Sequence, residues 1–286
     1  MSKRLLYSVV ILLAGLFSAG QSVFAQQQPR IDMLRPIYVV AGVPLSETPT
    51  RNNFDIKIQF SFAVPVCDDI AGSGVRAAVG YTQVSLWNIL GRSMPFYEHS
   101  FIPGIYFSKE WKVSDGTRTL TAGFEHKSNG RDDAWSRSLN YLFITYLREY
   151  ANGLVLKVNA RPGWGDYGKP VAMDVPLMYT GFVDFGVDYE PSAFPLGLHL
   201  NVTPIYNKSI ANVTAGLTCR LSRNPMVPQL YLQFHDGYDE ALRDVMNVNG
   251  PIIYPDGIIP YIPGEPIPPR TFIRAGVRLS LHEYVY

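Results

Sequence analysis

Residues 121–128 read TAGFEHKS, and their side chains alternate between two kinds. Successive side chains of a β-strand point to opposite faces, so this stretch predicts a strand with two different faces. One face carries Ala122, Phe124, His126 and Ser128, and the other carries Thr121, Gly123, Glu125 and Lys127. A membrane-spanning barrel turns its apolar set towards lipid and its polar set towards the lumen. The pattern therefore places His126 and Ser128 on a lipid-facing surface, near its outer rim.

Similar runs, separated by turn residues, repeat along the chain, and helical periodicity is lacking. We expect twelve strands, at 35–43, 54–65, 74–87, 98–108, 117–128, 138–150, 153–162, 177–189, 197–206, 211–222, 228–237 and 271–285. An even number of antiparallel strands closes with both termini on the periplasmic side. The sequence thus predicts an all-β fold, a twelve-stranded antiparallel transmembrane β-barrel.

The same strand plan puts the longest connections, 88–97, 129–137, 163–176 and 238–270, on the outer side. Segment 238–270 is rich in proline, which cannot donate a hydrogen bond to a ladder. We therefore expect an irregular outer loop there and no extra strands. A lid over the surface and a plain insertion both remain open as its role.

The first residues indicate export. Ser2-Lys3-Arg4 is basic, the stretch from Leu5 to Leu16 is almost wholly apolar, and Val23-Phe24-Ala25 has small residues where a signal peptidase reads. We expect a signal peptide over 1–25 and a single barrel domain over 26–286. The apolar run is shorter than the roughly 20 residues of a spanning helix, which ranks a membrane anchor below export.

Charge and cysteine content exclude some classes of function. Lys and Arg number 25 against 24 Asp and Glu, so no excess of positive charge favours nucleic acid. Cys67 and Cys219 are the only cysteines. Export permits a disulfide between them, but their separation leaves the pairing open, and two thiols alone make no zinc site.

His126 and Ser128 stand side by side on one strand face, so the imidazole can reach the hydroxyl. A serine nucleophile needs such a base, and a third group must orient the imidazole. Asn140 lies near the start of the next antiparallel strand. It is an even number of positions from Leu142, Ile144 and Tyr146, so it belongs to the same strand face as these residues. Spacing alone also fits a passive barrel, with Glu125, Lys127 and Arg148 in the lumen, or a lipid-binding transporter.

Two blocks of sequence resemble the bacterial outer-membrane phospholipase A family. The first is His126-Lys127-Ser128-Asn129-Gly130-Arg131, followed by Ser136-Arg137-Ser138 and Asn140. The second is Tyr81-Thr82-Gln83-Val84-Ser85 with Trp87, Ser93, Pro95-Phe96 and Glu98. The resemblance implies a twelve-stranded barrel in the bacterial outer membrane with its active site towards the outer leaflet. It also implies phospholipase A1, A2 and lysophospholipase activity on membrane phospholipids, with calcium and as a homodimer.

The resemblance assigns a role to each site residue. It implies that Ser128 is the nucleophile, His126 the general base and Asn140 the group that orients the imidazole. It further implies a calcium ion held by the main-chain carbonyl of Arg131 and the side chain of Ser136, with Ser93 from the opposing subunit. Gln83 would lie near the acyl-binding surface, and Asp133 would add negative potential.

The sequence departs from the family pattern at a few positions. Met94 follows Ser93, Tyr97 stands where the family usually has Arg, and the loop before Ser93 is short. Leu139 replaces the usual aromatic residue before Asn140. The departures concern the calcium ligand Ser93 more than the three catalytic residues.

Overall fold

A computed structural model describes residues 30–46, 48–131, 136, 138–166, 181–205, 211–238, 252–254, 257–259 and 270–279. The expected signal peptide, 1–25, lies outside these residues, as do Asp133 and most of segment 238–270. Within the described ranges, no helix has the length and apolar character needed to cross a membrane.

Fifteen strands and one short 3-10 helix make up the described chain. The helix is η2 (Ile70–Gly72). The strands are β1 (Ile37–Pro44), β2 (Asp55–Cys67), β3 (Val75–Trp87), β4 (Phe96–Val113), β5 (Gly116–Ser128), β6 (Ser138–Tyr150), β7 (Leu154–Ala160), β8 (Gly163–Asp166), β9 (Val183–Tyr189), β10 (Leu196–Pro204), β11 (Ala211–Cys219), β12 (Gln229–Gly237), β13 (Ile252–Tyr254), β14 (Gly257–Ile259) and β15 (Arg270–Leu279).

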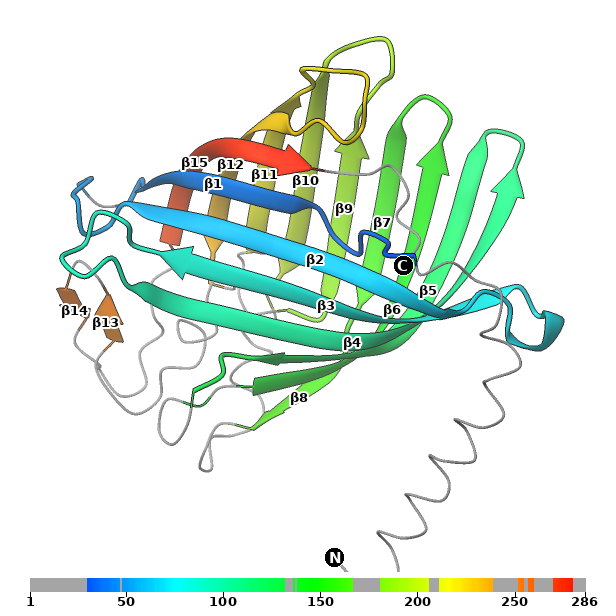
Figure 1. The fold of residues 1–286 in the computed structure, drawn as a ribbon, viewed down its shortest axis with the longest axis horizontal. Coiled ribbons are helices and arrows are strands. Elements are labelled where there is room, and N and C mark those ends of the chain that lie inside the picture. The colour runs from blue at the N-terminus through cyan, green and yellow to red at the C-terminus, as the bar shows by residue number, and fades with distance from the viewer. Residues whose placement is uncertain are drawn as a thin grey trace, which may run out of the picture. The chain divides into compact units, whose positions relative to one another are not determined.

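Neighbouring strands pair antiparallel around a closed sheet (Figure 1). β1 pairs with β15 at one junction, and β5 pairs with β6 at another, so the ring is closed. β7 and β8 pair with successive parts of β6, through Ile144↔Ala160 and Tyr141↔Gly163, and together fill one strand position. The ring therefore has twelve positions, which confirms the predicted twelve-stranded barrel.

The structure corrects three expectations about strand limits. β4 runs to Val113, beyond the expected end at 108. The seventh position continues past Pro162 into β8, which the sequence placed in an outer loop; the Pro162 carbonyl still accepts a hydrogen bond from the Leu142 amide at 3.0 Å. In segment 238–270, β13 and β14 form a separate hairpin, so the expectation of no extra strands was wrong. Its strands are three residues long and contain no proline, so the ladder forms between the prolines.

Exposure follows the predicted alternation. On β5, Thr119 and Thr121 are buried while Leu120 and Ala122 are exposed. On β6, Leu139 and Tyr141 are buried, and Leu142, Ile144 and Tyr146 are exposed. The faces of both strands are therefore as expected, with His126, Ser128 and Asn140 on the outward one.

Arg148 is the exception to the expected lumen lining. It shares the parity of the exposed β6 residues and lies beside the turn, where its guanidinium donates to the Thr117 carbonyl at 2.8 Å and pairs with Asp115. The sequence interpretation of Arg148 as a lumen residue was therefore wrong. Cys67 and Cys219, whose pairing the sequence left open, are both free.

A buried ion pair joins two strands that are not neighbours. Arg274 on β15 donates from Nε to Asp55 Oδ1 at 2.7 Å and from a terminal nitrogen to Oδ2 at 2.9 Å. The Tyr97 hydroxyl donates to the same carboxylate at 2.5 Å. Because both charges are almost fully buried, neither can be left alone without a large desolvation cost.

We predict that Asp55→Ala lowers the free energy of unfolding by about 3–5 kcal/mol, because it leaves the Arg274 guanidinium buried without its carboxylate. The matched control is Asp115→Ala, which removes a carboxylate that is 59% exposed in its pair with Arg148. That change should cost at most about 1 kcal/mol. Urea unfolding in lipid vesicles, followed by tryptophan fluorescence, measures both. Equal losses in the two variants would contradict the prediction.

Candidate active site

β5 and β6 bring the three predicted catalytic residues to one patch of the outward surface. His126 lies directly opposite Asn140 in the ladder, and Ser128 lies opposite Ser138. All three side chains are half-buried. The uninterrupted pairing of β5 with β6 fixes this register from Gly116 to Ser128. β5 thus supplies His126 and Ser128, and β6 supplies Asn140.

His126 and Asn140 are hydrogen-bonded. The imidazole Nδ1 lies 2.8 Å from the Asn140 side-chain oxygen. Because an amide oxygen only accepts, this contact places the proton on Nδ1 and leaves Nε2 with a free lone pair. Nε2 is the nitrogen that a base needs for accepting a proton from a neighbouring hydroxyl.

Ser128 is the last residue of β5, two positions beyond His126 on the same face. Among the described residues, no hydrogen bond joins the imidazole to the Ser128 hydroxyl. Contacts between a base and its nucleophile are often long without substrate and tighten when it binds. The structure thus forms the orienting contact and places the serine next to the base.

The chain after Ser128 folds back against β4. Gly130 adopts a φ of +66°, and a Cβ there would lie 2.6 Å from the Phe101 ring, so both the backbone and the packing favour glycine. The Arg131 guanidinium donates to the Tyr97 carbonyl at 2.8 Å. These contacts hold the start of this outer loop, with the Arg131 main chain, close to the end of β5. Ser136 follows in the same loop and is half-buried.

Ser93 and Gln83 lie on the β3 side of the patch. Ser93 is exposed in the loop between β3 and β4, which is closed by hydrogen bonds from the Asn88 amide to the Pro95 carbonyl and from Trp87 to the Met94 carbonyl. Gln83 is on the outward face and pairs with Phe101, which in turn pairs with Ser128. Gln83 and Ser128 are therefore two strands apart, on the order of 10 Å.

The metal ligands of the resemblance are oxygens of neutral groups. In the part of the chain that the structure describes, no three His, Cys, Asp or Glu side chains gather as a metal site. A cation beside Ser128 would therefore depend on carbonyl and hydroxyl oxygens such as those of Arg131 and Ser136. Calcium accepts such ligands together with water.

Sequence reasoning missed a chain of polar contacts on the outward face. The Tyr81 hydroxyl donates to Gln83 Oε1 at 2.9 Å, Gln83 donates to the Ser85 hydroxyl at 3.0 Å, and that hydroxyl lies 2.9 Å from His99 Nδ1. The rings of Trp87, Phe96, His99 and Phe101 stack beside it in sequence. The alternation along β3 could have indicated these contacts, because it places the polar residues Gln83 and Ser85 on the lipid-facing side of the strand.

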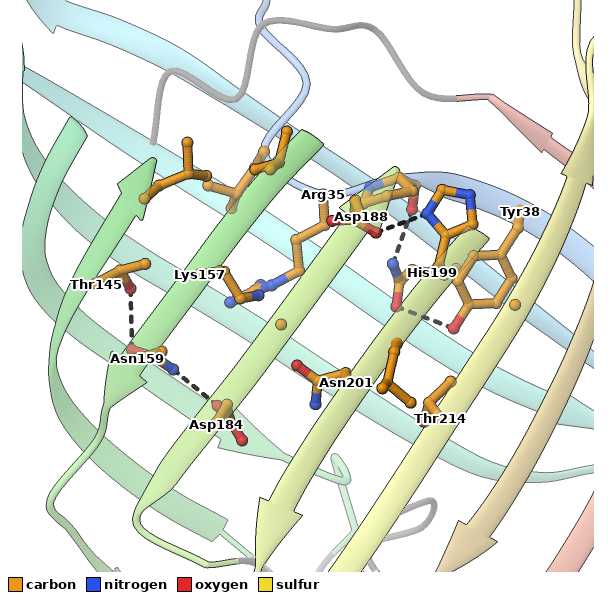
Figure 2. Close-up of a pocket in the computed structure, with 18 of the residues that line it drawn as sticks. Arg35, Tyr38, Thr145, Lys157, Asn159, Asp184, Asp188, His199, Asn201 and Thr214 are labelled. Carbon is orange, nitrogen blue, oxygen red and sulfur yellow. Dashed lines mark hydrogen bonds and ion pairs between the residues drawn. The ribbon is translucent and has the colours of Figure 1, made fainter. Parts of the chain in front are cut away.

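The lumen holds a separate cavity of about 410 Å³, lined mainly by polar and charged side chains (Figure 2). His199 lies 2.6 Å from Asp188, and Asn159 links Thr145 to Asp184. His126, Ser128 and Asn140 do not line this cavity, because they point away from the lumen. The candidate active site is thus on the outer wall of the barrel.

Comparison with known proteins identifies the family to which this chain belongs. The model of the family described as Phospholipase A1 matches residues 40–249. A Phospholipase A1 of Proteus vulgaris is 28% identical over 198 residues, covering 68% of this chain and 65% of the relative. That of Escherichia coli strain K12 is 28% identical over 195 residues, covering 66% and 64%. The chain thus matches slightly less than two thirds of the length of these relatives.

Solved structures share the fold. Outer membrane phospholipase A from Escherichia coli superposes with a TM-score of 0.68 at 20% identity, covering 87% of this chain and 93% of that one. An outer membrane phospholipase dimer of Salmonella typhi with bound calcium gives 0.68 at 20% identity, covering 88% and 92%. The closed barrel with its apolar outer face is that of a bacterial outer-membrane protein, and the chain belongs to the phospholipase A1 family.

Proposed function

We propose that this protein hydrolyses acyl ester bonds of membrane phospholipids at the lipid-facing patch of β5 and β6. The observation that carries the proposal is the hydrogen bond between His126 Nδ1 and Asn140, on the outward face and next to Ser128. Family membership supplies the substrate class. A site on the outer wall suits a substrate whose acyl chains lie in the bilayer.

The three residues divide the chemistry in the usual way for a serine hydrolase. His126 Nε2 takes the proton of the Ser128 hydroxyl as the oxygen attacks the ester carbonyl. The imidazolium then gives that proton to the departing alcohol, a lysophospholipid, and leaves an acyl group on Ser128. A water molecule, deprotonated by the same nitrogen, releases the fatty acid and restores the hydroxyl. Asn140 keeps the imidazole in the required tautomer throughout.

A calcium ion fits the oxygen donors beside Ser128. The Arg131 carbonyl and the Ser136 hydroxyl would hold it from the outer loop, with the Ser93 hydroxyl of a second copy. Bound there, the ion would supply positive charge that stabilises the developing oxyanion. The Salmonella typhi relative, a dimer with bound calcium, supports this part of the proposal.

A single copy would have low activity because its calcium site lacks the ligand from the second copy. An enzyme embedded in its own substrate needs a way to stay inactive, and a calcium site shared between two barrels provides one. The lipid-facing sides of two copies would meet in an isologous dimer, with the active site towards the outer leaflet and Gln83 near the acyl-binding surface.

The triad predicts that Ser128→Ala and His126→Ala each lower kcat by roughly 10³-fold or more, because each removes a group that acts as one unit. Asn140→Ala should lower it less, since asparagine adds no charge to the imidazole. Fatty acid release from defined phospholipid vesicles with calcium measures this. The matched control is Ser138→Ala, the serine opposite Ser128, which should keep the full rate. Wild-type hydrolysis by Ser128→Ala would exclude this triad, and no hydrolysis by the wild type would favour a passive barrel.

The calcium proposal predicts that a chelator abolishes hydrolysis and that added calcium restores it. Ser136→Ala should raise the calcium concentration for half-maximal activity by roughly tenfold, because one ligand is lost. Ser93→Ala should do the same, and mixing it with Ser128→Ala should restore part of the activity, because one copy then contributes the serine ligand and the other the nucleophile. A full rate in excess chelator would refute the role of calcium.

A further inference from the structure

We propose that Glu125 is a positioning residue for the active site, which it serves from the opposite face of β5. The inference rests on the proposed function, because it concerns how His126 and Ser128 are held. Glu125 precedes His126 and points into the lumen, so the two residues share one peptide bond while facing opposite sides of the wall. A side chain fixed inside therefore restrains the backbone that carries the base outside.

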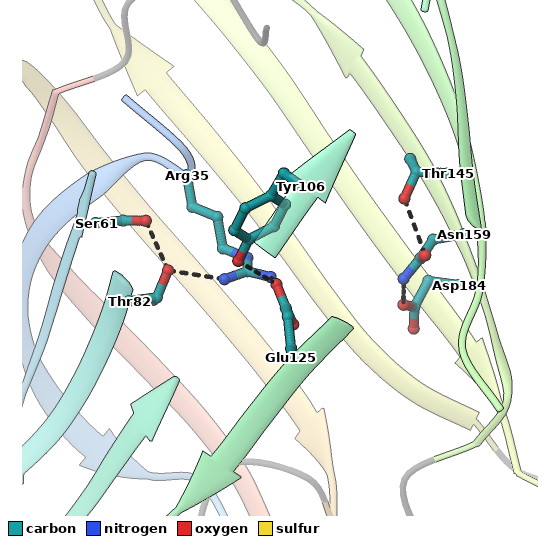
Figure 3. Close-up of polar contacts among 8 residues, drawn as sticks. All are labelled: Arg35, Ser61, Thr82, Tyr106, Glu125, Thr145, Asn159 and Asp184. Carbon is teal, nitrogen blue, oxygen red and sulfur yellow. Dashed lines mark hydrogen bonds and ion pairs between the residues drawn. The ribbon is translucent and has the colours of Figure 1, made fainter. Parts of the chain in front are cut away.

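Glu125 is the centre of a polar cluster that ties β5 to other strands (Figure 3). Its Oε1 accepts a hydrogen bond from the Tyr106 hydroxyl of β4 at 2.7 Å and pairs with the Arg35 guanidinium. Arg35 also donates to Thr82 of β3 at 2.7 Å, and Thr82 lies 2.6 Å from the Ser61 hydroxyl of β2. One carboxylate thus connects β2, β3, β4 and the segment before β1.

Most of the cluster is shielded from water, although the Arg35 side chain is 35% exposed. Ser61, Thr82 and Tyr106 are each at most 2% exposed, and the Glu125 side chain is 12% exposed. Glycines leave the space for the Tyr106 ring: a Cβ at Gly80 would lie 2.8 Å from it, and one at Gly104 would lie 2.7 Å from its hydroxyl oxygen. Charge-assisted hydrogen bonds in such surroundings hold their geometry more firmly than exposed ones.

The ladder explains why this restraint is needed at His126. β4 pairs with β5 continuously from Val113↔Gly116 to Gly104↔Glu125, and again at Phe101↔Ser128. Between these points, Ile102 and Pro103 have no partner in β5 among the described pairs. Pro103 falls opposite His126 in this register and has no amide hydrogen to donate, so the ladder with β4 is weaker beside His126. The Glu125 cluster adds a connection to β4 one residue away.

Misplacement of a catalytic group by about 1 Å can cost roughly 100-fold in rate. The cluster does not touch the outward surface where substrate binds. Loosening it should therefore lower kcat and leave KM unchanged.

The test compares Glu125→Gln, Arg35→Ala and Tyr106→Phe with the wild type. Tyr106→Phe removes one hydroxyl and keeps the ring, so it retains the packing if Glu125→Gln fails to fold. We expect each change to lower kcat by roughly 3- to 30-fold at constant KM. The double variant of Glu125→Gln and Arg35→Ala should lose no more than the larger single effect, because both act through one contact. Asp188→Asn, which changes a lumen carboxylate bonded to His199 far along the sheet, should stay within about twofold of the wild-type kcat.

A second readout separates positioning from general stability and from catalysis. In the ¹⁵N-histidine NMR spectrum, the His126 Nδ1–H signal reports its hydrogen bond to Asn140. That signal should shift or broaden in Glu125→Gln and Tyr106→Phe and stay in place in Asp188→Asn. Unchanged kcat and an unchanged His126 signal in folded Glu125→Gln and Tyr106→Phe would overturn the inference. Full activity of Ser128→Ala would instead overturn the proposed function, while the histidine signal would still decide the role of Glu125.

Discussion

The structure depends on one constraint: in a bilayer, every backbone amide and carbonyl of a spanning strand must find a partner within the protein. A closed antiparallel sheet satisfies it, and β1 meets β15 to complete the ring. Closure gives each strand a fixed register and two faces. From this follow a polar lumen, an apolar outer wall, and a wall on which a base and a hydroxyl can face lipid.

Polar groups on the two faces have different physical tasks. In the lumen they satisfy one another, as in the pair of Arg274 with Asp55 and the cluster around Glu125, so that charge is buried with partners. On the outer wall, polar side chains face hydrocarbon, and their hydrogen bonds must be made locally, as His126 makes with Asn140. Placing a histidine on a lipid-facing surface costs free energy even when it is hydrogen-bonded, which agrees with a catalytic role.

Most of the fold was predicted from the alternation of side chains between the two faces of each strand. Because the period of a strand is two, the parity of TAGFEHKS was enough to place His126 and Ser128 outward, and that of Leu142 and Ile144 placed Asn140 beside them. The assignment of Arg148 to the lumen was wrong because it did not follow the alternation: Arg148 belongs to the same set as Leu142 and Ile144, and its side chain pairs with Asp115 beside the turn. The expected end of the seventh strand at residue 162 was too early, since the missing amide of Pro162 interrupts the strand without ending its position in the sheet.

Contacts between distant segments could not be predicted. Nothing in the local sequence links Arg35 to Glu125 or Arg274 to Asp55, because these pairs depend on closure of the ring and on which inward side chains then meet. The polar chain through Gln83, Ser85 and His99 is similar: each residue can be assigned to a face, but the contacts need the register of β3 with β4.

Covalent labelling can identify the nucleophile, which we propose is Ser128 on the outer wall. A long-chain alkyl sulfonyl fluoride reacts with an activated serine hydroxyl, and mass spectrometry of the digested protein identifies the residue. We predict one adduct per chain, on Ser128, formed in the wild type and absent after His126→Ala. An adduct on another residue with Ser128 unmodified, or labelling of Ser128 that is as fast without His126, would contradict it.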